Sequence, residues 1–212
     1  MKRGPIYIVG AGGHGKVVLS AALALGLEVA GVLDDDTEKL GARVLGVPVI
    51  GTPEDVLSSM PHTSAAPGIG DNRTRREVVL RLSPLSIEWI PLVHPAAFVH
   101  PSAQVGEGSV VFAGAVIQPD CRIGAHCIVN TGALIDHDCV IGDFCHVAPG
   151  CAIAGGVGLG EGAFLGIGAA IIPGVTVGAW ATVGAGSTVI RDVPPGATVV
   201  GTPARPIHEV KP

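Results

Sequence analysis

An apolar residue recurs at every sixth position from Val99 to Val189, and this period constrains the fold more than any other feature of the chain. All sixteen positions in this phase are Val, Ile or Leu, without a slip. A period of six fits neither the turn of an α-helix nor the alternation of a flat strand. It is typical of hexapeptide repeats, which bury their apolar side only by stacking on their neighbours. The pattern therefore predicts a β-helix of stacked coils.

The fourth residue after each of these apolar positions is small or is valine, and all five cysteines of the chain fall in this phase. They are Cys121, Cys127, Cys139, Cys145 and Cys151. Buried free cysteine behaves as a small hydrophobe. An odd number of cysteines without a C-x-x-C pair argues against a zinc site or a disulfide framework. We interpret the five cysteines as small residues that fill the interior of the coils.

Composition and charge exclude several classes of protein. Hydrophobic residues make up 48% of the 212 residues, so the 32 glycines do not indicate disorder. A net charge of -5 gives no basic surface for nucleic acid. No run of about 18 apolar residues could cross a bilayer, and a strand pattern follows Pro5 without a secretory signal. We therefore expect a cytoplasmic protein that neither inserts into membranes nor binds nucleic acid.

The residues before the repeat alternate between strand and helix patterns, which predicts βαβ units and a small parallel sheet. Strands or extended segments are expected at 6–9, 28–33, 44–50 and 65–69. Helices are expected at 16–25, from Pro53 onward, and at 74–82, and a linker is expected at 85–93. We expect two domains, a Rossmann-like nucleotide-sugar-binding α/β domain over residues 1–92 and an all-β parallel β-helix over residues 93–212.

Three glycines with the spacing G-x-G-x-x-G, Gly10, Gly12 and Gly15, follow the first expected strand. Bare backbone at the start of a helix lets phosphate oxygens reach the amide N–H groups, where the helix dipole favours negative charge. Asp34, at the end of the second strand, can accept hydrogen bonds from ribose hydroxyls. A tight turn that serves packing alone is the alternative. Because only about ninety residues precede the repeat, a nucleoside diphosphate fits better than NAD.

His137 stands out among the histidines because it lies between Asp136 and Asp138. With three hexads in each coil, residues eighteen apart stack at the strand spacing of about 4.8 Å, which places Gly155 over His137. A neighbouring carboxylate can hold the imidazole tautomer and stabilise the imidazolium, as a general base near neutral pH requires. An ordinary exposed histidine is the alternative.

Other polar residues of the repeat carry weaker signals. His146, half a coil from His137, is left open between packing at a corner and contact with a ligand. Asn130-Thr131-Gly132 lies on the same face as neighbouring coil residues, and Asn130 could equally be a stacking position inside the turn. His100 and His126 are expected at the surface. No three metal ligands stack on one face, so we expect no metal site.

The chain resembles, over essentially its full length, the hexapeptide-repeat sugar acetyltransferases of the sialic acid O-acetyltransferase NeuD and bacillosamine N-acetyltransferase PglD type. It is also similar to the perosamine N-acetyltransferases, whose acceptor is a GDP-sugar. The resemblance rests on Ile8 to Lys16, Leu33-Asp34-Asp35, Ile69 to Asn72, Asn130-Thr131-Gly132, Asp136-His137-Asp138, His146-Val147 and Gly201 to Ala204. It implies a left-handed β-helix, a homotrimer, acetyl-CoA as the donor and a nucleotide-linked amino sugar as the acceptor.

The resemblance also implies roles for single residues. His137 matches the general base, and Asp138 matches the acid that orients it, which is Glu in some relatives. His146 matches a residue that contacts the acetyl group, and Gly155 matches the glycine whose N–H binds the thioester oxygen, so both are expected to bind acetyl-CoA. The expected contacts to the nucleotide sugar are Gly12, Gly13, His14 and Gly15 at the pyrophosphate, and Asp34 and Asp35 at the nucleoside.

We therefore expect an acetyl-CoA-dependent N-acetyltransferase that acts on a nucleotide-linked 4-amino-4,6-dideoxy sugar, either a UDP-4-amino sugar or GDP-perosamine. O-acetylation of sialic acid is the first alternative, and the glycine loop argues against it because free sialic acid has no pyrophosphate. A non-catalytic scaffold that binds nucleotides is the second, and the Asp-His-Asp cluster beside Gly155 argues against it. The nucleotide base, the sugar configuration and the pathway are left open by the sequence.

Overall fold

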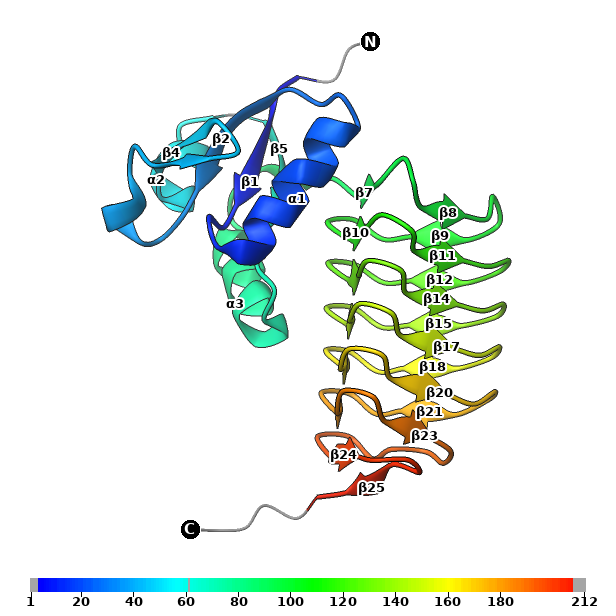
Figure 1. Cartoon of the computed structure of the whole chain (residues 1–212). Coiled ribbons are helices and arrows are strands. Elements are labelled where there is room, and N and C mark those ends of the chain that lie inside the picture. The colour runs from blue at the N-terminus through cyan, green and yellow to red at the C-terminus, as the bar shows by residue number, and fades with distance from the viewer. Residues whose placement is uncertain (1–3, 61, 208–212) are drawn as a thin grey trace, which may run out of the picture.

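A six-stranded sheet forms the N-terminal part of the chain, in the order β3-β4-β2-β1-β5-β6 (Figure 1). The computed structural model describes residues 4–60 and 62–207, so the outer ends of both expected domains lie outside the described residues. The strands are β1 (Ile6–Val9), β2 (Val29–Leu33), β3 (Arg43–Val44), β4 (Val47–Gly51), β5 (Thr63–Pro67) and β6 (Ile87–Trp89). The helices are α1 (Gly13–Ala24), α2 (Pro53–Leu57) and α3 (Asn72–Leu82), with a 3-10 turn η1 (Thr37–Lys39).

The strand and helix pattern expected for this part is confirmed, with one segment wrong. Residues 85–93 were expected to be a linker, but Ile87–Trp89 pairs in parallel with β5 as an edge strand. Pro84 and Pro91 lie on either side of this strand, where they remove none of its hydrogen bonds. The extended segment expected at 44–50 is a hairpin of β3 and β4 that turns at Leu45 and Gly46, both with positive φ.

The rest of the chain forms a parallel β-helix whose coils have three sides, and each side is one sheet. We call these sheets faces A, B and C. Face A contains β7 (Leu92–Val93), β10 (Val110–Val111), β13 (Ile128–Val129), β16 (His146–Val147), β19 (Phe164–Leu165), β22 (Thr182–Val183), β24 (Thr198–Val200) and the antiparallel β25 (Arg205–Pro206). Face B contains β8 (Phe98–Val99), β11 (Val116–Ile117), β14 (Leu134–Ile135), β17 (Ala152–Ile153), β20 (Ala170–Ile171) and β23 (Thr188–Val189). Face C contains β9 (Gln104–Val105), β12 (Arg122–Ile123), β15 (Val140–Ile141), β18 (Gly158–Leu159) and β21 (Thr176–Val177).

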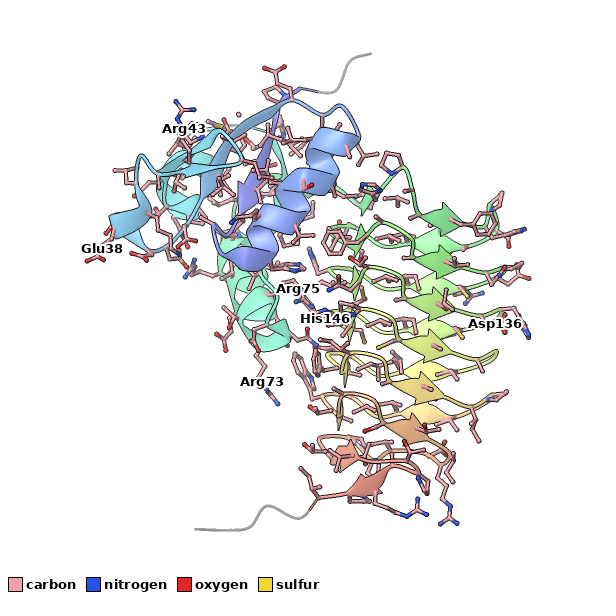
Figure 2. All side chains as sticks on the ribbon, in the orientation of Figure 1. Glu38, Arg43, Arg73, Arg75, Asp136 and His146 are labelled. Carbon is pink, nitrogen blue, oxygen red and sulfur yellow. The ribbon has the colours of Figure 1, made fainter. Side chains whose placement is uncertain are left out.

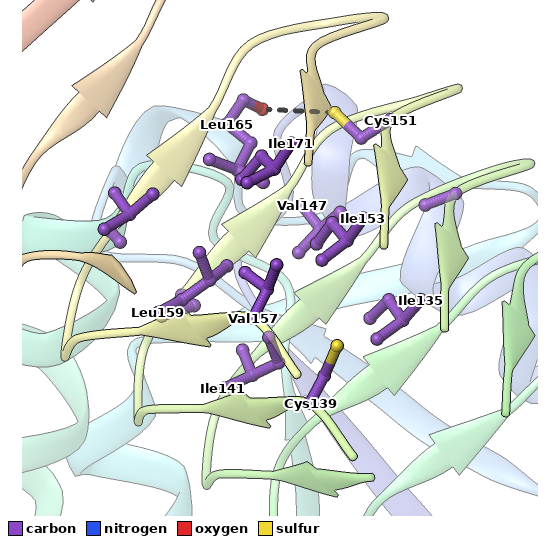
Figure 3. Packing of buried hydrophobic residues seen from close by; sticks show 14 of the residues in the cluster. Ile135, Cys139, Ile141, Val147, Cys151, Ile153, Val157, Leu159, Leu165 and Ile171 are labelled. Atoms are coloured by element: carbon purple, nitrogen blue, oxygen red, sulfur yellow. Dashed lines mark hydrogen bonds between the residues drawn. The ribbon is translucent and has the colours of Figure 1, made fainter. Parts of the chain in front are cut away.

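The six-residue period fills the interior of this β-helix, as Figure 3 shows. Val110 pairs with Ile128, so one coil contains the expected eighteen residues. Every residue of the apolar phase from Val111 to Val189 is buried. Val99 and Val105, in the first coil, are partly buried and pack against the same core.

The five cysteines lie in this interior as free, buried thiols, which confirms their role as small filling residues. Each thiol also donates to the carbonyl oxygen of the residue fifteen positions later. The acceptors are Asp136, Gly142, Ala154, Gly160 and Gly166, at 2.9 to 3.3 Å. Ser109 makes the same contact with Gly124 at 2.7 Å. A thiol thus supplies a hydrogen bond that alanine could not make.

The N-terminal sheet is fixed to face A through α1. Val18, Leu19 and Ala22 of this helix share one apolar cluster with Phe112 and other side chains of face A. The expected domain boundary, between residues 92 and 93, falls inside β7, which pairs with β10. This boundary remains a prediction. None of the helices in the described ranges has the length and apolarity that crossing a bilayer requires.

Candidate active site

The glycine loop between β1 and α1 combines two tightly packed glycines with two open ones. Gly10 has a φ of 115°, and a Cβ there would lie 2.8 Å from the carbonyl oxygen of Gly68. A Cβ on Gly15 would collide with the carbonyl oxygen of Gly10. Around Gly12 and Gly13, by contrast, no atom lies within 4 Å of a Cβ position, and no side chain caps α1 at Gly12. The start of α1 is therefore open to an anion.

Asp34 and Asp35 follow β2 beside this loop. The Asp34 carboxylate accepts from the Ala11 N–H at 2.7 Å, the Asp36 N–H at 3.0 Å and Lys39 Nζ at 3.0 Å. Burial favours a higher pKa for Asp34, but these hydrogen bonds outweigh it and lower the pKa. Asp35 is exposed and pairs with Arg81 at 2.8 Å.

A cavity of about 160 Å³ lies at the carboxyl ends of β1, β2 and β5. Its lining includes Gly10, Asp34 and Asp35. Strand order reverses at β1, because β2 lies on one side of it and β5 on the other. Ligands of open α/β sheets bind at such a point. The structure therefore brings the glycine loop and the two acids to one cavity.

His14 and His146 meet where the N-terminal domain packs on face A. The ring of His14, in the first turn of α1, lies edge-on to Phe112 with centroids 5.6 Å apart. Its centroid is 6.1 Å from that of His146 on β16. Burial, with a smaller effect of the Arg75 charge, lowers the pKa of each histidine to about 4. Both imidazoles are neutral at pH 7.

Hydrogen bonds fix the orientation and tautomer of His146. Asn130 Oδ1 accepts from the Thr131 N–H at 2.8 Å, so Asn130 Nδ2 is the group that faces His146 Nε2 at 3.1 Å. Because Nδ2 donates, Nε2 accepts and carries no proton. The proton of the neutral ring is then on the remaining nitrogen, Nδ1. Asn130 thus holds His146, which lies on a strand and not at a corner of the coil.

His137 lies between β14 and β15, at the corner where faces B and C meet. Its Nδ1 is 2.7 Å from Asp138 Oδ2, and 60% of its side chain is exposed. The hydrogen bond with Asp138, and then the charge of Asp136, raise the pKa of His137. A Cβ on Gly155 would lie 2.7 Å from His137 Nε2. The stacking of His137 on Gly155 is therefore present in the structure.

The backbone N–H of Gly155 is available to a ligand. One coil earlier, the N–H of His137 donates to Asp136 Oδ1 at 2.8 Å. Ala154, which precedes Gly155, has no side-chain oxygen to act in the same way. No acceptor for the Gly155 N–H lies within the described part of the chain.

One chain does not bring these two groups of residues together. In a three-sided coil, the corner between faces B and C lies opposite face A, on which the N-terminal domain packs. Figure 2 shows Asp136 at the edge of the β-helix away from that domain and His146 on the side that faces it. His137, Asp138 and Gly155 therefore form one half of the candidate site. The glycine loop, Asp34, Asp35, His14 and His146 form the other half.

Comparisons with known proteins identify the family. The family described as the PglD N-terminal domain matches residues 5–82, and that of the bacterial transferase hexapeptide (six repeats) matches residues 102–137. PerB from Caulobacter crescentus, solved with CoA and GDP-perosamine, is 43% identical with a TM-score of 0.91, over 97% of this chain and 98% of that one. The chain belongs to the hexapeptide-repeat sugar N-acetyltransferases of the PglD type.

Further members of this family agree with that assignment. The acetyltransferase domain of PglB from Neisseria gonorrhoeae, solved with acetyl coenzyme A, is 40% identical with a TM-score of 0.89, over 96% of this chain and 98% of that one. The UDP-N-acetylbacillosamine N-acetyltransferase of Bacillus subtilis is 42% identical over 112 residues. That match covers 51% of each chain, and a match to an uncharacterised mimivirus protein covers 21% of the viral protein. The chain thus spans about half or less of the curated relatives that it matches.

One histidine of this family member lies in a different place from the one expected. His126 was predicted at the surface, but it is 4% exposed. It stacks on Phe144 with centroids 5.1 Å apart and lies edge-on to Trp89 at 5.6 Å. The N-terminal domain covers this corner of the coil, and the repeat pattern carries no information on what packs against it. His100 is partly exposed, as expected.

The sequence analysis did not single out Arg75, although it is completely buried in the structure. It lies in the polar run that starts α3, where neighbouring arginines suggest a solvated face. The only signal is helical spacing, because Asn72, Arg75, Val79 and Leu82 share one side of the helix and all are buried. No cluster of three metal-ligating side chains occurs in residues 4–60 and 62–207.

Stability is expected to fall with acidity because His14, His126 and His146 are each buried with a pKa of about 4. In the unfolded chain these residues bind protons below about pH 6.5, whereas in the folded chain they stay unprotonated down to about pH 4. The stability they contribute is therefore complete above pH 6.5 and is lost as the pH falls toward 4. Each shift corresponds to about 3 kcal/mol. Urea unfolding between pH 7 and 4.5 measures this loss.

His126→Phe is the matched variant for this measurement. Phe144 has a φ of 57° at the equivalent position one coil later, close to the 54° of His126, so the backbone accepts the change. The variant is expected to have a flatter dependence of unfolding free energy on pH than the wild type. If the unfolding free energy depended on pH equally in both proteins, the assignment of a lowered pKa to His126 would be contradicted.

Proposed function

We propose that this chain transfers the acetyl group of acetyl-CoA to the amino group of a nucleotide-linked 4-amino-4,6-dideoxy sugar. The observation that carries the proposal is the exposed His137–Asp138 pair beside the free N–H of Gly155. The pair supplies a base, and the N–H supplies a donor for an oxyanion. PerB binds CoA and GDP-perosamine, and PglB binds acetyl coenzyme A, which supports these substrate classes.

The reaction begins at Nε2 of His137, since Nδ1 is held by Asp138. His137 removes a proton from the sugar amine as the nitrogen attacks the thioester carbonyl carbon. The new C–N bond forms, and the negative charge on the carbonyl oxygen is stabilised by the Gly155 N–H. The C–S bond then breaks, and the proton on His137 passes to the leaving CoA thiolate. General-base catalysis contributes about 10²–10⁴-fold in rate, and one oxyanion donor about 10²–10³-fold.

The nucleotide part of the acceptor is assigned to residues 1–92. The pyrophosphate lies on the open start of α1, at Gly12, Gly13, His14 and Gly15. Asp34 already accepts three hydrogen bonds, which leaves little capacity for the nucleoside. Asp35 is exposed in the lining of the same cavity and has Arg81 as its partner at 2.8 Å, so it is the more accessible acceptor. Acetyl transfer is assigned to residues 93–212.

A second copy of the chain is needed to complete this site. Face B bears a row of outward apolar residues, Phe98, Val116, Leu134, Ala152 and Ala170, and Phe98 and Leu134 are about half exposed. A groove of about 540 Å³ is lined by Val116, Leu134, Ala152 and Ala170 of this row and reaches Asp136, next to His137. Exposed apolar surface of this kind favours protein contact. We assign face B to a homotrimer interface that brings His137 of one chain to the crevice of the next, in a cytoplasmic enzyme.

An assay of CoA release with acetyl-CoA and GDP-, UDP- or dTDP-linked 4-amino sugars tests the proposal. Release with at least one of them, together with an acetylated product, is expected. Release with sialic acid alone would support O-acetylation, and no release with any acceptor would support a nucleotide-binding scaffold. The panel also identifies the nucleotide base.

A further inference from the structure

A crevice of about 240 Å³ lies between the start of α3 and the later coils of face A, outside both halves of the candidate site. Its lining comes from both domains and includes residues 70–73, Phe164, Trp180 and Thr182. Asn72 ties the two walls together, because its Nδ2 donates to the carbonyl oxygens of Gly162 and Ala163 at 3.1 and 3.3 Å. Ligands bind preferentially at domain junctions of this kind.

Arg73 presents a free guanidinium to this crevice. Its Cζ lies 4.8 Å from the centroid of the Trp180 ring. No hydrogen bond or carboxylate partner of this guanidinium occurs among residues 4–60 and 62–207. The contact between a cation and an aromatic ring is weak at an exposed site. A phosphate can therefore draw the guanidinium off the ring and bind it through two parallel hydrogen bonds.

The acidic side chains near Arg73 already have partners. Asp71 Oδ1 accepts from the N–H and the hydroxyl of Thr74 at 2.8 and 2.9 Å, at the start of α3, where the helix dipole offsets its charge. Glu161 pairs with Arg76 at 3.0 Å. Arg73 is thus the charged side chain of the crevice that is left to bind an anion.

The crevice lies on the far side of His146 from the start of α1. The strands of face A follow one another in the order β10, β13, β16, β19 and β22. His14, in the first turn of α1, contacts Phe112, next to β10, and His146 on β16. Phe164, on β19, lies edge-on to His146 with centroids 5.3 Å apart and forms a wall of the crevice. Figure 2 shows Arg73 beyond His146, toward the later coils.

We propose that this crevice receives the phosphate-bearing arm of the acyl donor and that Arg73 binds a phosphate of CoA. The inference rests on the proposed function, because it takes acetyl-CoA as the donor. The pyrophosphate of the acceptor is assigned to the start of α1, so the thioester approaches His146 from the opposite side. The narrow pantetheine arm fits between the aromatic edges of Phe164 and Trp180, and the phosphate at its end meets the unpaired guanidinium.

Calorimetric titration of the full-length protein with CoA, without an acceptor, tests this assignment. Arg73→Met keeps the apolar stem of the side chain and removes the charge. Its Kd for CoA is expected to rise about 10-fold, as for the loss of a hydrogen bond to a charged group, and its Kd for GDP and UDP to stay unchanged. Arg122→Met is the matched control, since it removes the same charge from an exposed position on face C. It is expected to bind CoA like the wild type.

Truncated ligands identify the group that Arg73 binds. Pantetheine has no phosphate, so the wild type and Arg73→Met are expected to bind it equally. Dephospho-CoA lacks only the 3′-phosphate. If Arg73→Met still weakens binding of dephospho-CoA, the contact is to the diphosphate, and if it does not, the contact is to the 3′-phosphate.

Trp180 gives a second readout, because Trp89→Phe leaves it as the only tryptophan of the chain. Its fluorescence is expected to change on addition of CoA, with the Kd found by calorimetry. Unchanged fluorescence at saturating CoA would contradict the proposal. If Trp89→Phe does not fold, the calorimetry of Arg73→Met decides.

Equal affinity of the wild type and Arg73→Met for CoA would overturn the assignment, and so would an equal loss with pantetheine. Weaker binding of GDP or UDP with unchanged binding of CoA would place the acceptor in the crevice and overturn it as well. None of these titrations depends on acetyl transfer. CoA bound through Arg73 in a protein that releases no CoA from acetyl-CoA would therefore support this inference and refute the proposed function.

Discussion

Replacing His137 with alanine is expected to lower kcat by about 10²–10⁴-fold and to leave the KM for both substrates nearly unchanged. The reason is that the imidazole accepts a proton only as the amine attacks, so it contributes little to binding of the ground state. His137 is also exposed at a corner, so its loss leaves no cavity in the core. Steady-state CoA release measures the change.

His100→Ala is the control for this variant, because His100 also lies in a surface turn of the β-helix and has no part in the site. It is expected to keep wild-type kinetics. Near-normal turnover in His137→Ala would remove His137 from the role of base. The pH profile gives a second readout. The hydrogen bond with Asp138 raises the pKa of His137, so the rise of wild-type kcat with pH is expected at a higher pH than an ordinary histidine would give. In Asp138→Asn this rise moves to lower pH.

Replacing Gly155 with alanine is expected to lower kcat by about 10²–10³-fold. The added methyl group would lie 2.6 Å from His137 Cε1 and 2.7 Å from Nε2, so the ring has to leave its place over the Gly155 N–H. The base and the oxyanion donor are then no longer aligned on one carbonyl group. Single-turnover measurements with saturating substrates report this step directly.

Gly158→Ala is the matched control on the next strand of the same coil. A Cβ there has its nearest neighbour, Thr176, at 3.8 Å, which is an ordinary van der Waals contact. Its stability and kcat are expected to stay close to those of the wild type. Wild-type kcat in Gly155→Ala would show that the place of His137 over Gly155 has no role in the chemistry.

The repeat was predictable because every coil obeys the same constraint. A residue that points inward at each sixth position has to be aliphatic, and this fixes the coil length, the core, the filling cysteines and the place of Gly155 over His137. All of these features follow from contacts between neighbouring coils of the same β-helix. The glycine loop was predictable for a similar reason, since Gly10 and Gly15 meet backbone atoms a few residues away or just after the adjacent strand β5.

The features that were missed depend on what packs on the outside of the β-helix. The period says nothing about the outer surface, so His126 looked like any other turn residue until α3 and Trp89 were in place over it. Apart from Asn72 Oδ1, the acceptors of Arg75 are backbone carbonyl groups, which have no signature in the sequence. The sequence does not show that His137 and the glycine loop are far apart, because each lies in a clear motif of its own. Only the topology places them on opposite sides of the β-helix within one chain.

We propose that each active site is shared between two chains, and mixed assemblies test this sharing directly. Gly13→Asp places a carboxylate at the open start of α1, where it fits without a clash but repels a pyrophosphate. Assemblies of only this variant, or of only His137→Ala, are expected to be inactive. In one-to-one mixed trimers, about a quarter of the interfaces join an intact His137 to an intact glycine loop. Recovery of about a quarter of wild-type activity on mixing is the predicted result. Mixed trimers with no recovered activity would contradict the shared site, because a site within one chain stays defective in every subunit.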